Sequence, residues 1–546
     1  MNKEIIRAEN LSLYYEEMER PVFINLSFQI HACENVLILG PSGSGKSSLI
    51  QCLNGLYPRE LDGTMKGSVT VNGKSTRDFQ PGAASKHVGV VFQDPETQFC
   101  MLTVEDEIAF GLENLRIPVQ EMEAIIDDVL HSVGLFEFKS AQISKLSGGQ
   151  KQKLALACIL AMEPEVIILD EPTANLDPVA SKDFVVTLSA LKRKRDFALI
   201  VIEHQLDDWV TLLERAFILQ RDGTCLYDGP LRKGMELHAA SLQKQGIWMP
   251  FAAQTAIKKK IAFHRLPLHL EELVNVNKPE VLNVSHPASR HKPGDVLLEA
   301  YNVSWKKVVK SITLQIHQHE FIAIVGANGS GKTSLSRLLA GIAKPSKGKI
   351  SFQGKLLSQW KERHLYEKLG YVFQNPEHQF ITDSVYEEIA FGLRIKYPNN
   401  QEAERKTEKV LSQFHLEQWK HHHPFALSQG QKRRLSVAAM LASDQSLLFL
   451  DEPTFGQDAA STDNLMELLM NKYNKGTSIV MITHDMNLVD QFATRVLVMD
   501  EGRIAVEASP AELWERGDLG DFQLTYPNRI DLARMLEKRK DSYVPS

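Results

Sequence analysis

The chain carries one domain twice. The segment VFQDPETQF at residues 91–99 returns as VFQNPEHQF at residues 372–380, and EIAFGL at 107–112 returns unchanged at 388–393. Further landmarks recur after 280 to 286 residues. Because this period is longer than the unit of a solenoid or a propeller, the repeat predicts a duplicated domain. The length of 546 residues agrees with this, since a single hydrophobic core stops growing at about 250 to 300 residues.

Between the two copies the landmarks are absent and five prolines accumulate, which predicts a linker with at most one short helix. The C-terminal end also lies outside the repeat. We therefore divide the chain into a first domain, a linker, a second domain and a C-terminal tail, at residues 1–245, 246–294, 295–515 and 516–546.

Composition and charge predict a cytoplasmic protein that does not itself cross a membrane. The longest apolar run is nine residues, 154–162, whereas a spanning helix needs about 20. The start MNKEIIRAEN lacks the apolar core of a secretory signal. The five cysteines form no CxxC pair and are expected to be reduced thiols. A net charge of -6 argues against a general nucleic-acid binder, which needs a basic surface to release counterions from phosphates.

Six short apolar runs, three in each copy, lack the alternation of a strand with one solvated face. Such runs are typical of strands that are buried on both faces of a mainly parallel sheet. Helical segments lie between them, so we expect each copy to fold as an α/β domain. The runs are NVLILG at 35–40, VIILD at 166–170 and LIVIEH at 199–204 in the first copy, and FIAIVG at 321–326, LLFLD at 447–451 and IVMITH at 479–484 in the second.

A glycine-rich loop follows the first of these runs in each copy. GPSGSGKS at 40–47 and GANGSGKT at 326–333 both fit the phosphate-loop pattern GxxxxGK[ST] between a predicted strand and a helix. Glycines let successive backbone N–H groups converge on phosphate oxygens, and the helix N-terminus favours negative charge. Ordinary glycine turns do not account for two such matches at equivalent positions. We expect Lys46 and Lys332 to contact the β- and γ-phosphates of ATP.

Hydroxyl and carboxylate groups near the two loops suit Mg2+, a hard ion that prefers oxygen ligands. Ser47 and Thr333 end the loops, and Asp170 and Asp451 end the second apolar run of their copies. We expect each hydroxyl to bind Mg2+ together with the aspartate of the same copy.

A glutamate follows each of these aspartates, within the sequence DEPT in both copies. We expect Glu171 and Glu452 to orient or deprotonate the water that attacks ATP. The alternative is a carboxylate that only caps the next turn, which does not explain why DEPT follows a phosphate loop twice.

The segment LSGGQ at 146–150 lies between the phosphate loop and DEPT, and the second copy has LSQGQ at 427–431. With these segments the chain resembles the ATP-binding cassette (ABC) family of P-loop NTPases. The resemblance implies a fold with a mainly parallel core sheet, an antiparallel β part and a helical signature subdomain. It also implies that the two domains pair head to tail, so that each ATP lies between the phosphate loop of one and the signature of the other. Gln429 replaces a glycine in the second signature, which implies a working but unequal site.

The resemblance assigns two further pairs of polar residues. Gln93 and Gln374 match the glutamine of the family that senses the metal and the attacking water. His204 and His484 match its contact to the γ-phosphate.

An aromatic ring usually stacks on adenine in this family. Tyr15, in LSLYYEE, stands at that position in the first copy, whereas Lys307 occupies it in the second, with Trp305 nearby. The adenine contact of the second site therefore stays open.

The candidate site residues form three groups. The expected nucleotide-binding residues are Tyr15, Gly40, Pro41, Ser42, Gly43, Ser44, Gly45, Lys46, Ser47, Ser48, Ser147, Gly148, Gly149, Gln150, Gly326, Ala327, Asn328, Gly329, Ser330, Gly331, Lys332, Thr333, Ser334, Ser428, Gln429, Gly430 and Gln431. The expected catalytic residues are Glu171, Glu452, His204, His484, Gln93 and Gln374. The expected Mg2+ ligands are Ser47, Asp170, Gln93, Thr333, Asp451 and Gln374.

The segments after each glutamine are more specific. FQDPETQF followed by TVEDEIAFGLEN, and FQNPEHQF followed by SVYEEIAFGLRI, resemble the ATPases of energy-coupling factor (ECF) transporters, which import vitamins and cobalt or nickel. This resemblance implies two membrane partners, a transmembrane coupling subunit and a small substrate-binding subunit, and a position on the cytoplasmic face of the cell membrane. Fused forms of these ATPases are associated with thiamine or its pyrimidine precursor.

A second class of protein, the ribosome-associated translation factors of the same superfamily, also carries two such domains in one soluble chain. Those factors have a longer, strongly basic helical linker, whereas Glu271, Glu272 and Glu280 offset the lysines of this linker. The FQ(D/N)PExQF segment favours a membrane partner. ATP-driven transport is therefore the preferred function, with a translation factor as the alternative.

Overall fold

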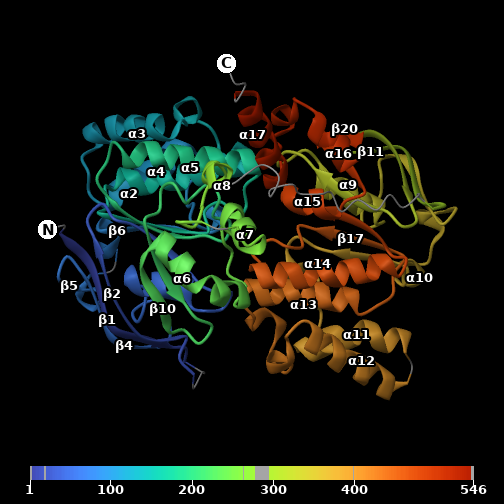
Figure 1. Ribbon diagram of the computed structural model, residues 1–546, viewed down its shortest axis with the longest axis horizontal. Coiled ribbons are helices and arrows are strands. Elements are labelled where there is room, and N and C mark those ends of the chain that lie inside the picture. Colours follow the sequence, from blue (N-terminus) through green and yellow to red (C-terminus); the bar gives the residue numbers. More distant parts are fainter. Residues whose placement is uncertain are drawn as a thin grey trace. The chain divides into compact units, whose positions relative to one another are not determined.

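The computed structural model describes residues 3–16, 20–80, 82–261, 263–276, 294–397 and 399–542. The chain forms two compact units, which correspond to the two copies of the repeat. Figure 1 shows the elements of both units, coloured along the sequence from blue to red. In the described part of the chain, no helix combines the length and the apolar character that a membrane span requires.

The first unit contains ten strands and eight α-helices among its described residues. They are β1 (Glu4–Tyr14), β2 (Phe23–His31), β3 (Asn35–Leu39), α1 (Lys46–Leu53), β4 (Thr64–Val71), β5 (Lys74–Ser75), β6 (Val88–Val91), α2 (Val104–Asn114), α3 (Val119–Val133), α4 (Gly148–Ala161), β7 (Val166–Asp170), α5 (Pro178–Lys192), β8 (Ala198–Ile202), β9 (Arg215–Leu219), β10 (Cys225–Pro230), α6 (Leu231–Lys244), α7 (Phe251–Lys258) and α8 (Leu270–Val276).

The second unit repeats this order up to its C-terminal helices, except that it has two additional short helices, α10 and α15. Its elements are β11 (Val296–Trp305), β12 (Val309–His317), β13 (Phe321–Val325), α9 (Lys332–Leu339), β14 (Lys347–Phe352), β15 (Lys355–Leu356), α10 (Glu362–Tyr366), β16 (Leu369–Val372), α11 (Val385–Lys396), α12 (Asn400–Gln413), α13 (Gln429–Leu441), β17 (Leu447–Asp451), α14 (Ala459–Asn474), β18 (Ser478–Ile482), α15 (Met486–Phe492), β19 (Arg495–Asp500), β20 (Arg503–Ala508), α16 (Pro510–Glu515) and α17 (Asn528–Ser542).

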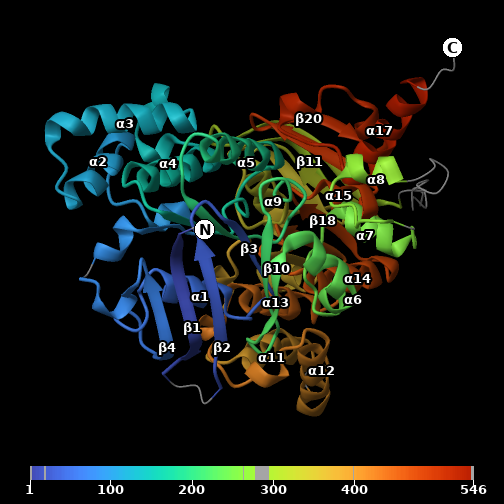
Figure 2. The same ribbon diagram turned by 60° about the vertical axis from the view of Figure 1, so that its left-hand side comes forward.

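Each unit holds a six-stranded and a four-stranded sheet. In the first unit the six strands have the order β10-β9-β3-β8-β7-β6, and all neighbours are parallel except β9 and β10. The second unit has the equivalent order β20-β19-β13-β18-β17-β16 with the equivalent exception. The four-stranded sheets, β2-β1-β4-β5 and β12-β11-β14-β15, are antiparallel, and Figure 2 shows β1, β2 and β4 side by side. The predicted α/β fold is confirmed.

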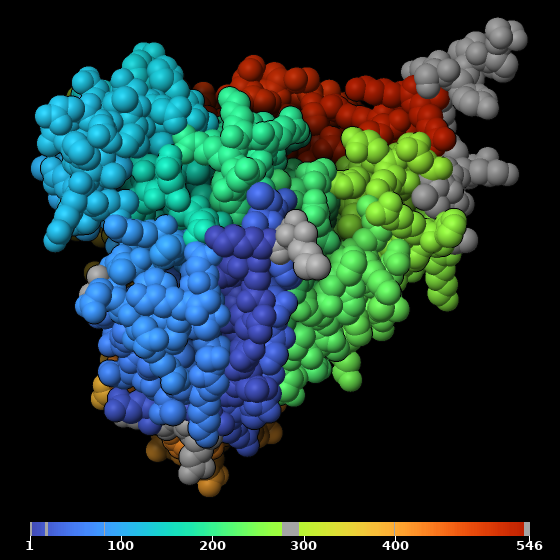
Figure 3. All heavy atoms as spheres, turned by 90° about the vertical axis from the view of Figure 1, so that its left-hand side faces the viewer, coloured from blue at the N-terminus to red at the C-terminus, as the bar shows by residue number. Residues whose placement is uncertain are grey.

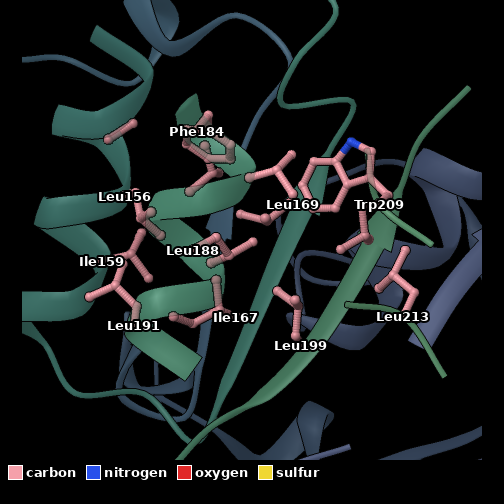
Figure 4. Packing of buried hydrophobic residues seen from close by; sticks show 14 of the residues in the cluster. Leu156, Ile159, Ile167, Leu169, Phe184, Leu188, Leu191, Leu199, Trp209 and Leu213 are labelled. Atoms are coloured by element: carbon pink, nitrogen blue, oxygen red, sulfur yellow. The ribbon is translucent and has the colours of Figure 1, made fainter. Parts of the chain in front are cut away.

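The central strands of the six-stranded sheet, such as β3 and β8, are buried on both faces. Successive side chains of a strand point to opposite sides, so each of these strands contributes to two clusters. In β8, Leu199 and Val201 enter a cluster with the helices α4 and α5. Ile200 and Ile202 enter a second cluster, which includes α1 and the antiparallel sheet. Figure 4 shows the first cluster around Phe184 of α5, with side chains of helices and strands facing one another. Burial on both faces explains why the apolar runs lack alternation.

A helical part lies beside the sheets in each unit. In the first unit α4 contacts α2, α3 and α5, and in the second α11 contacts both α12 and α13. Figure 3 shows α2 and α3 as a cyan lobe that is distinct from the blue strands of the antiparallel sheet. The signature helices α4 and α13 thus connect this helical part to the core of each unit.

The described part of the predicted linker has more structure than expected. It forms two helices, α7 and α8, where the prolines predicted at most one, and Figure 2 shows the two helices close together. Ala253 and Leu266 are buried in the core of the first unit. Arg232 of α6 donates two hydrogen bonds of 2.7 Å to the Glu272 carboxylate of α8. Apolar side chains between the prolines cover the first unit here, while residues 277–293 lie outside the described residues.

The C-terminal tail packs within the second unit. Arg529 of α17 forms a bidentate ion pair with Asp490 of α15, with N–O distances of 2.7 and 2.8 Å. The indole Nε1 of Trp514 donates to the same carboxylate at 2.9 Å. The tail lies outside the repeat, so the sequence predicted no structure for it. Leu519 and Leu524 of the tail are buried in a cluster of the second unit.

Replacement of Phe184 by alanine is expected to destabilise the first unit by about 3 to 5 kcal/mol, because the ring is fully buried and its loss leaves a cavity. Val186 lies two positions further along α5 and is 59% exposed, so Val186→Ala is the matched control and should cost less than about 0.5 kcal/mol. Urea denaturation of the full chain measures both. Equal losses from the two variants would contradict the packing.

Candidate functional site

Each phosphate loop leads from a core strand into a helix, β3 into α1 and β13 into α9. Gly45 and Gly331 precede these helices with φ of 87° and 101°, a left-handed conformation that glycine adopts without strain. A side chain at Gly45 would also lie 2.8 Å from Val22 Cγ1. The glycines therefore set the turn that places each loop at a helix N-terminus, where unpaired N–H groups attract anions.

The loop lysines are buried and point back along their own loops. Lys46 Nζ donates to two loop carbonyl oxygens at 2.9 and 3.2 Å, and Lys332 Nζ donates to the equivalent pair at 2.8 Å. Burial lowers the pKa of Lys46, while the charges of Glu171 and Asp170 act in the opposite direction. A buried ammonium group needs anionic or hydrogen-bonding partners, and a polyphosphate supplies both.

Asp170 and Asp451 end β7 and β17 beside the loops. Thr333 Oγ1 donates to Asp451 Oδ1 at 3.1 Å. Burial, followed by the charge of Glu171, raises the pKa of Asp170 to about 6, and a hydrogen bond from Ser47 acts against this shift. Because β3, β8 and β7 are parallel neighbours, their carboxyl ends meet at one edge of the sheet. The structure therefore brings the predicted groups of each copy together.

The two glutamates after these aspartates have a strained backbone. Glu171 and Glu452 have φ of 47° and 50°, and a left-handed conformation costs about 1 to 3 kcal/mol for a residue other than glycine. Their N–H groups donate to Ile202 O at 2.9 Å and to Ile482 O at 3.1 Å, which ties each glutamate to the neighbouring strand. Such strain is typical of functional positions and fixes where the carboxylates point.

In the first unit the predicted catalytic side chains form a closed network. His204 Nε2 lies 2.9 Å from Glu171 Oε1, and Gln93 Nε2 donates to Oε2 of the same carboxylate at 2.9 Å. Asn175 Nδ2 donates to Gln93 O at 3.1 Å. Burial alone would raise the pKa of Glu171, but the neighbouring His204 and then Lys46 lower it overall. This carboxylate is ionised at neutral pH and is held from both sides.

The equivalent residues of the second unit are less tightly connected. Glu452 Oε1 lies 3.4 Å from His484 Nε2, and this buried oxygen has no hydrogen-bond partner among the described residues. Burial, assisted by Asp451 and opposed by Lys332, raises the pKa of Glu452 to about 8. Burial and then the charge of Lys332 lower the pKa of His484 to about 3. The two copies thus share residue types but differ in charge state.

Glu203 is a residue of this network that the motifs did not reveal. It is buried at the end of β8, where its carboxylate accepts hydrogen bonds from Thr173 N at 3.1 Å, from the Thr173 hydroxyl and from His204 N at 2.8 Å. Glu203 therefore connects the segment after Glu171 to His204. An acidic residue inside an apolar run was the signal that could have found it, and the second copy has Thr483 instead.

Arg433 and Tyr371 are two further residues that the sequence did not single out. Arg433 of α13 donates to Phe373 O at 2.8 Å and to Gln374 O, and Tyr371 contacts the carboxylate that ends β17. At the position of Arg433 the first copy has Gln152, whose buried Nε2 has no hydrogen-bond partner in the described part of the chain. The backbone around Gln374 is therefore held by hydrogen bonds from Arg433, whereas the first copy has Gln152 at the position of that arginine.

The signature segments begin helices α4 and α13. Ser147 accepts a hydrogen bond from Gln150 N at 3.3 Å, and the Gln150 side chain accepts one from Ser147 N at 2.8 Å. Ser428 and Gln431 form the same reciprocal pair at 3.4 and 2.9 Å. Gln429 is the first residue of α13, so its replacement of glycine leaves this cap intact. Each signature thus presents a hydroxyl and the positive end of a helix dipole.

An aromatic side chain lies near the end of the first strand in each copy. The Tyr15 hydroxyl is 2.6 Å from Ser48 Oγ, next to the phosphate loop. Trp305 ends β11, and Lys306 Nζ lies 4.3 Å from the centroid of its ring. The ammonium group therefore occupies one face of the Trp305 ring. The adenine contact expected of Tyr15 stays a prediction, and that of the second copy stays open.

The ABC transporter family model matches residues 23–174 and 309–455, more than half of the chain. The chain belongs to the ABC transporter family. It is 44% identical over 546 residues to the provisionally named HMP/thiamine import ATP-binding protein YkoD of Bacillus subtilis (strain 168), and the match covers 98% of each chain. Two provisionally named ABC transporter ATP-binding proteins are also similar. That of Methanosarcina mazei is 34% identical over 533 residues, which cover 93% of this chain and 90% of the relative. That of Methanosarcina acetivorans is 34% identical over 559 residues, which cover 98% of this chain and 90% of the relative.

Family membership identifies the two units as ATP-binding cassettes. The chain is therefore an ATPase and an ATP-binding subunit of an ABC transporter. The same comparisons favour transport over the alternative of a ribosome-associated translation factor.

Glutamine in place of the two glutamates of this ABC ATPase is expected to change local stability in opposite directions. The folded-state pKa of Glu171 is below the ordinary 4.5, so its charge stabilises the fold above that pH, and the stabilisation is lost as the pH falls through the lowered pKa. The folded-state pKa of Glu452 is about 8. Between about pH 4.5 and 8 only the folded state keeps that proton, so stability falls as the pH rises across this window.

Hydrogen–deuterium exchange of the nucleotide-free chain at about pH 7.5 measures both effects. We expect Glu171→Gln to speed exchange in β7, because the charged carboxylate that contacts His204 and Gln93 is lost. Glu452→Gln should slow exchange in β17, because glutamine cannot ionise. A change of the same sign in both strands would contradict the difference in charge state.

Proposed function

We propose that this ABC ATPase drives an importer of the energy-coupling factor type from the cytoplasmic face of the cell membrane. The observation that carries the proposal is the doubled arrangement of groups. In each unit a phosphate loop, an aspartate, a glutamate and a histidine lie at the carboxyl edge of parallel strands. Each unit also has a signature serine at a helix N-terminus. One chain therefore holds the parts of two ATP sites.

In the proposed mechanism each ATP site is completed by the signature of the opposite copy. The loop at residues 40–47 pairs with Ser428, and the loop at 326–333 pairs with Ser147. The capped N-termini of α4 and α13 support this role, since a helix N-terminus attracts the negative charge of a phosphate. Binding of two ATP molecules draws the cassettes together, and hydrolysis lets them separate, which supplies the movement for transport.

The residues at both sites fit a Mg2+ ion. Thr333 Oγ1 and Asp451 Oδ1 are 3.1 Å apart, and a hydroxyl and a carboxylate oxygen are ligands that this hard ion prefers. Bound Mg2+ would neutralise charge on the transferred phosphate. We assign its ligands as Ser47, Asp170 and Gln93 in the first site and Thr333, Asp451 and Gln374 in the second.

The protein groups around the attacking water have separate roles in this proposal. Glu171 and Glu452 orient the water or accept its proton, and His204 and His484 contact the γ-phosphate. The ionised, doubly hydrogen-bonded Glu171 carboxylate is already positioned as a base. Glu452 has a raised pKa and an unpaired oxygen among the described residues. We therefore infer that the two sites hydrolyse ATP at unequal rates.

The double variant Glu171→Gln with Glu452→Gln is expected to keep ATP binding and to lose turnover by about 10^2- to 10^4-fold, the usual contribution of a positioned acid–base group. Fluorescent nucleotide titration and phosphate release measure the two properties separately. The single variants give the rate of each site. Brisk hydrolysis by the double variant would refute the assignment of both glutamates.

A segment with exposed apolar side chains offers a docking surface for the membrane subunits. The buried carboxylate of Glu107 accepts hydrogen bonds of 2.9 and 2.7 Å from the backbone N–H groups of residues 100–101. Glu388 accepts the equivalent bonds at 3.0 Å from residues 381–382. Both glutamates belong to the repeated EIAFGL segment. In each unit a buried glutamate therefore holds the backbone of the loop that follows the segment of Gln93 or Gln374, and it does so by two hydrogen bonds.

Large apolar side chains are exposed around these fixed loops. Leu102 and Phe110 are 82% and 36% exposed in the first unit, and Ile381 and Phe391 are 68% and 49% exposed in the second. Phe110 and Phe391 are equivalent residues of the repeat. We call each pair the apolar patch of its unit and propose that the patches bind the transmembrane coupling subunit, because exposed apolar groups at a fixed place mark interaction sites.

Aspartate at Phe110 and Phe391 together is expected to abolish retention of the ATPase with its membrane partners, because a charge in the apolar patch has to be desolvated on docking. Val186→Asp, at another exposed apolar residue, is the control. Co-purification from detergent-solubilised membranes measures retention, and ATP hydrolysis by the purified chain reports that both variants fold. Normal retention of the double variant would place the docking surface elsewhere.

Similarity to YkoD, whose name refers to HMP/thiamine import, supports a proposal for the transported substrate. We propose thiamine or its pyrimidine precursor, captured by a separate small membrane subunit, as the substrate of the complete transporter. Cobalt and nickel are the alternatives that the ECF resemblance leaves open. Uptake of labelled thiamine into vesicles with the assembled transporter distinguishes them, since a cobalt or nickel importer would accumulate the metal instead.

A further inference from the structure

Asp451 in the second unit has a hydrogen-bond partner that the sequence of the first unit does not provide for Asp170. Tyr371 of β16 donates its phenol hydrogen to Asp451 Oδ2 at 3.3 Å. Thr333 Oγ1 donates to the other oxygen, Oδ1, at 3.1 Å. The repeat places Val90 at the position of Tyr371, and valine has no group that can donate. The two strand-end carboxylates therefore have different surroundings.

The Tyr371 hydroxyl is held in turn by Ser336 of α9, whose Oγ lies 2.9 Å away. Both side chains are buried, and the tyrosine ring packs against Phe373 and Phe449 at centroid distances of 4.8 and 6.3 Å. The repeat has Ile50 at the position of Ser336. A pair of hydroxyl residues in the second unit thus corresponds to two apolar residues in the first.

The hydrogen bond between Ser336 and Tyr371 can run in two directions, because each hydroxyl has one hydrogen and can also accept. Ser336 Oγ lies 2.9 Å from Tyr371 and also 2.9 Å from Thr333 O. When Tyr371 donates to Asp451, Ser336 is free to donate to Tyr371. When Ser336 donates to Thr333 O, Tyr371 can donate to Ser336 instead. An ionised carboxylate favours the first arrangement, since hydrogen bonds to charged acceptors are the stronger ones.

We propose that Tyr371 is a positioning residue of the second ATP site, which orients the Asp451 carboxylate toward the divalent cation. This inference rests on the proposed function, because it requires Asp451 to bind Mg2+. Thr333 and Tyr371 bond different oxygens of the carboxylate, so rotation of the group about its own axis would break both contacts. The first site has no tyrosine at this position and orients Asp170 by other means.

Tyr371→Phe tests the proposal, because it removes the hydroxyl and keeps the ring. The parent protein carries Lys46→Ala and Glu452→Gln, so that nucleotide binds at the second site and is not hydrolysed. Mn2+ binding in the presence of ATP is followed by electron paramagnetic resonance. We expect the Mn2+ Kd to rise about tenfold, since loss of a group that orients a metal ligand typically costs 10- to 100-fold in affinity. Affinity for ATP without a cation should stay the same.

Tyr473→Phe is the matched control in the same unit. Tyr473 is also buried, but its hydroxyl donates to His319 O at 3.1 Å, a contact outside the carboxylate group. This control should leave the Mn2+ Kd unchanged, and Ser336→Ala should raise it by less than Tyr371→Phe does. An unchanged Mn2+ Kd in Tyr371→Phe overturns the inference. A parent protein that binds no ATP contradicts the proposed function itself, which makes the two failures distinguishable.

Discussion

The parallel pairing of β3 with β8 and of β8 with β7 is the constraint on which both ATP sites depend. Parallel neighbours end at the same edge of a sheet. This edge therefore brings together the phosphate loop that follows β3, the carboxylates at the end of β7 and the histidine that follows β8. The equivalent strands β13, β18 and β17 repeat this in the second unit. The two faces of β3, β7 and β8 pack into two separate clusters, and a shift by one residue would move every side chain into the opposite cluster.

Identical motifs do not make identical sites, because the residues behind the motifs differ. Glu171 receives hydrogen bonds on both oxygens, whereas Glu452 is buried with one oxygen unpaired among the described residues. The supporting residues also differ between the copies, and the pairs at equivalent positions are Glu203 and Thr483, Val90 and Tyr371, and Gln152 and Arg433. The two copies therefore share the loop lysines, the strand-end aspartates, the glutamates and the histidines, while the residues that support these groups differ.

Most of the fold was predictable from the sequence, because the apolar runs and the phosphate loops report local geometry. The strands that carry Asp170 and Asp451 end at the predicted residues. Glu203, Tyr371 and Arg433 were missed because their roles depend on side chains that are distant in the sequence. The second of the two linker helices, α7 and α8, was missed for a related reason: the prolines indicated breaks, but not the apolar surface of the first unit that the segment covers.

Stoichiometry of ATP binding tests the central claim that each copy holds its own ATP site. The full chain with Glu171→Gln and Glu452→Gln is titrated with ATP and Mg2+ and examined by equilibrium dialysis. Two ATP molecules should bind per chain, and removal of the lysine from one loop, by Lys46→Ala or Lys332→Ala, should leave one. A single ATP in the starting protein, or two that persist after both lysines are removed, would contradict the account.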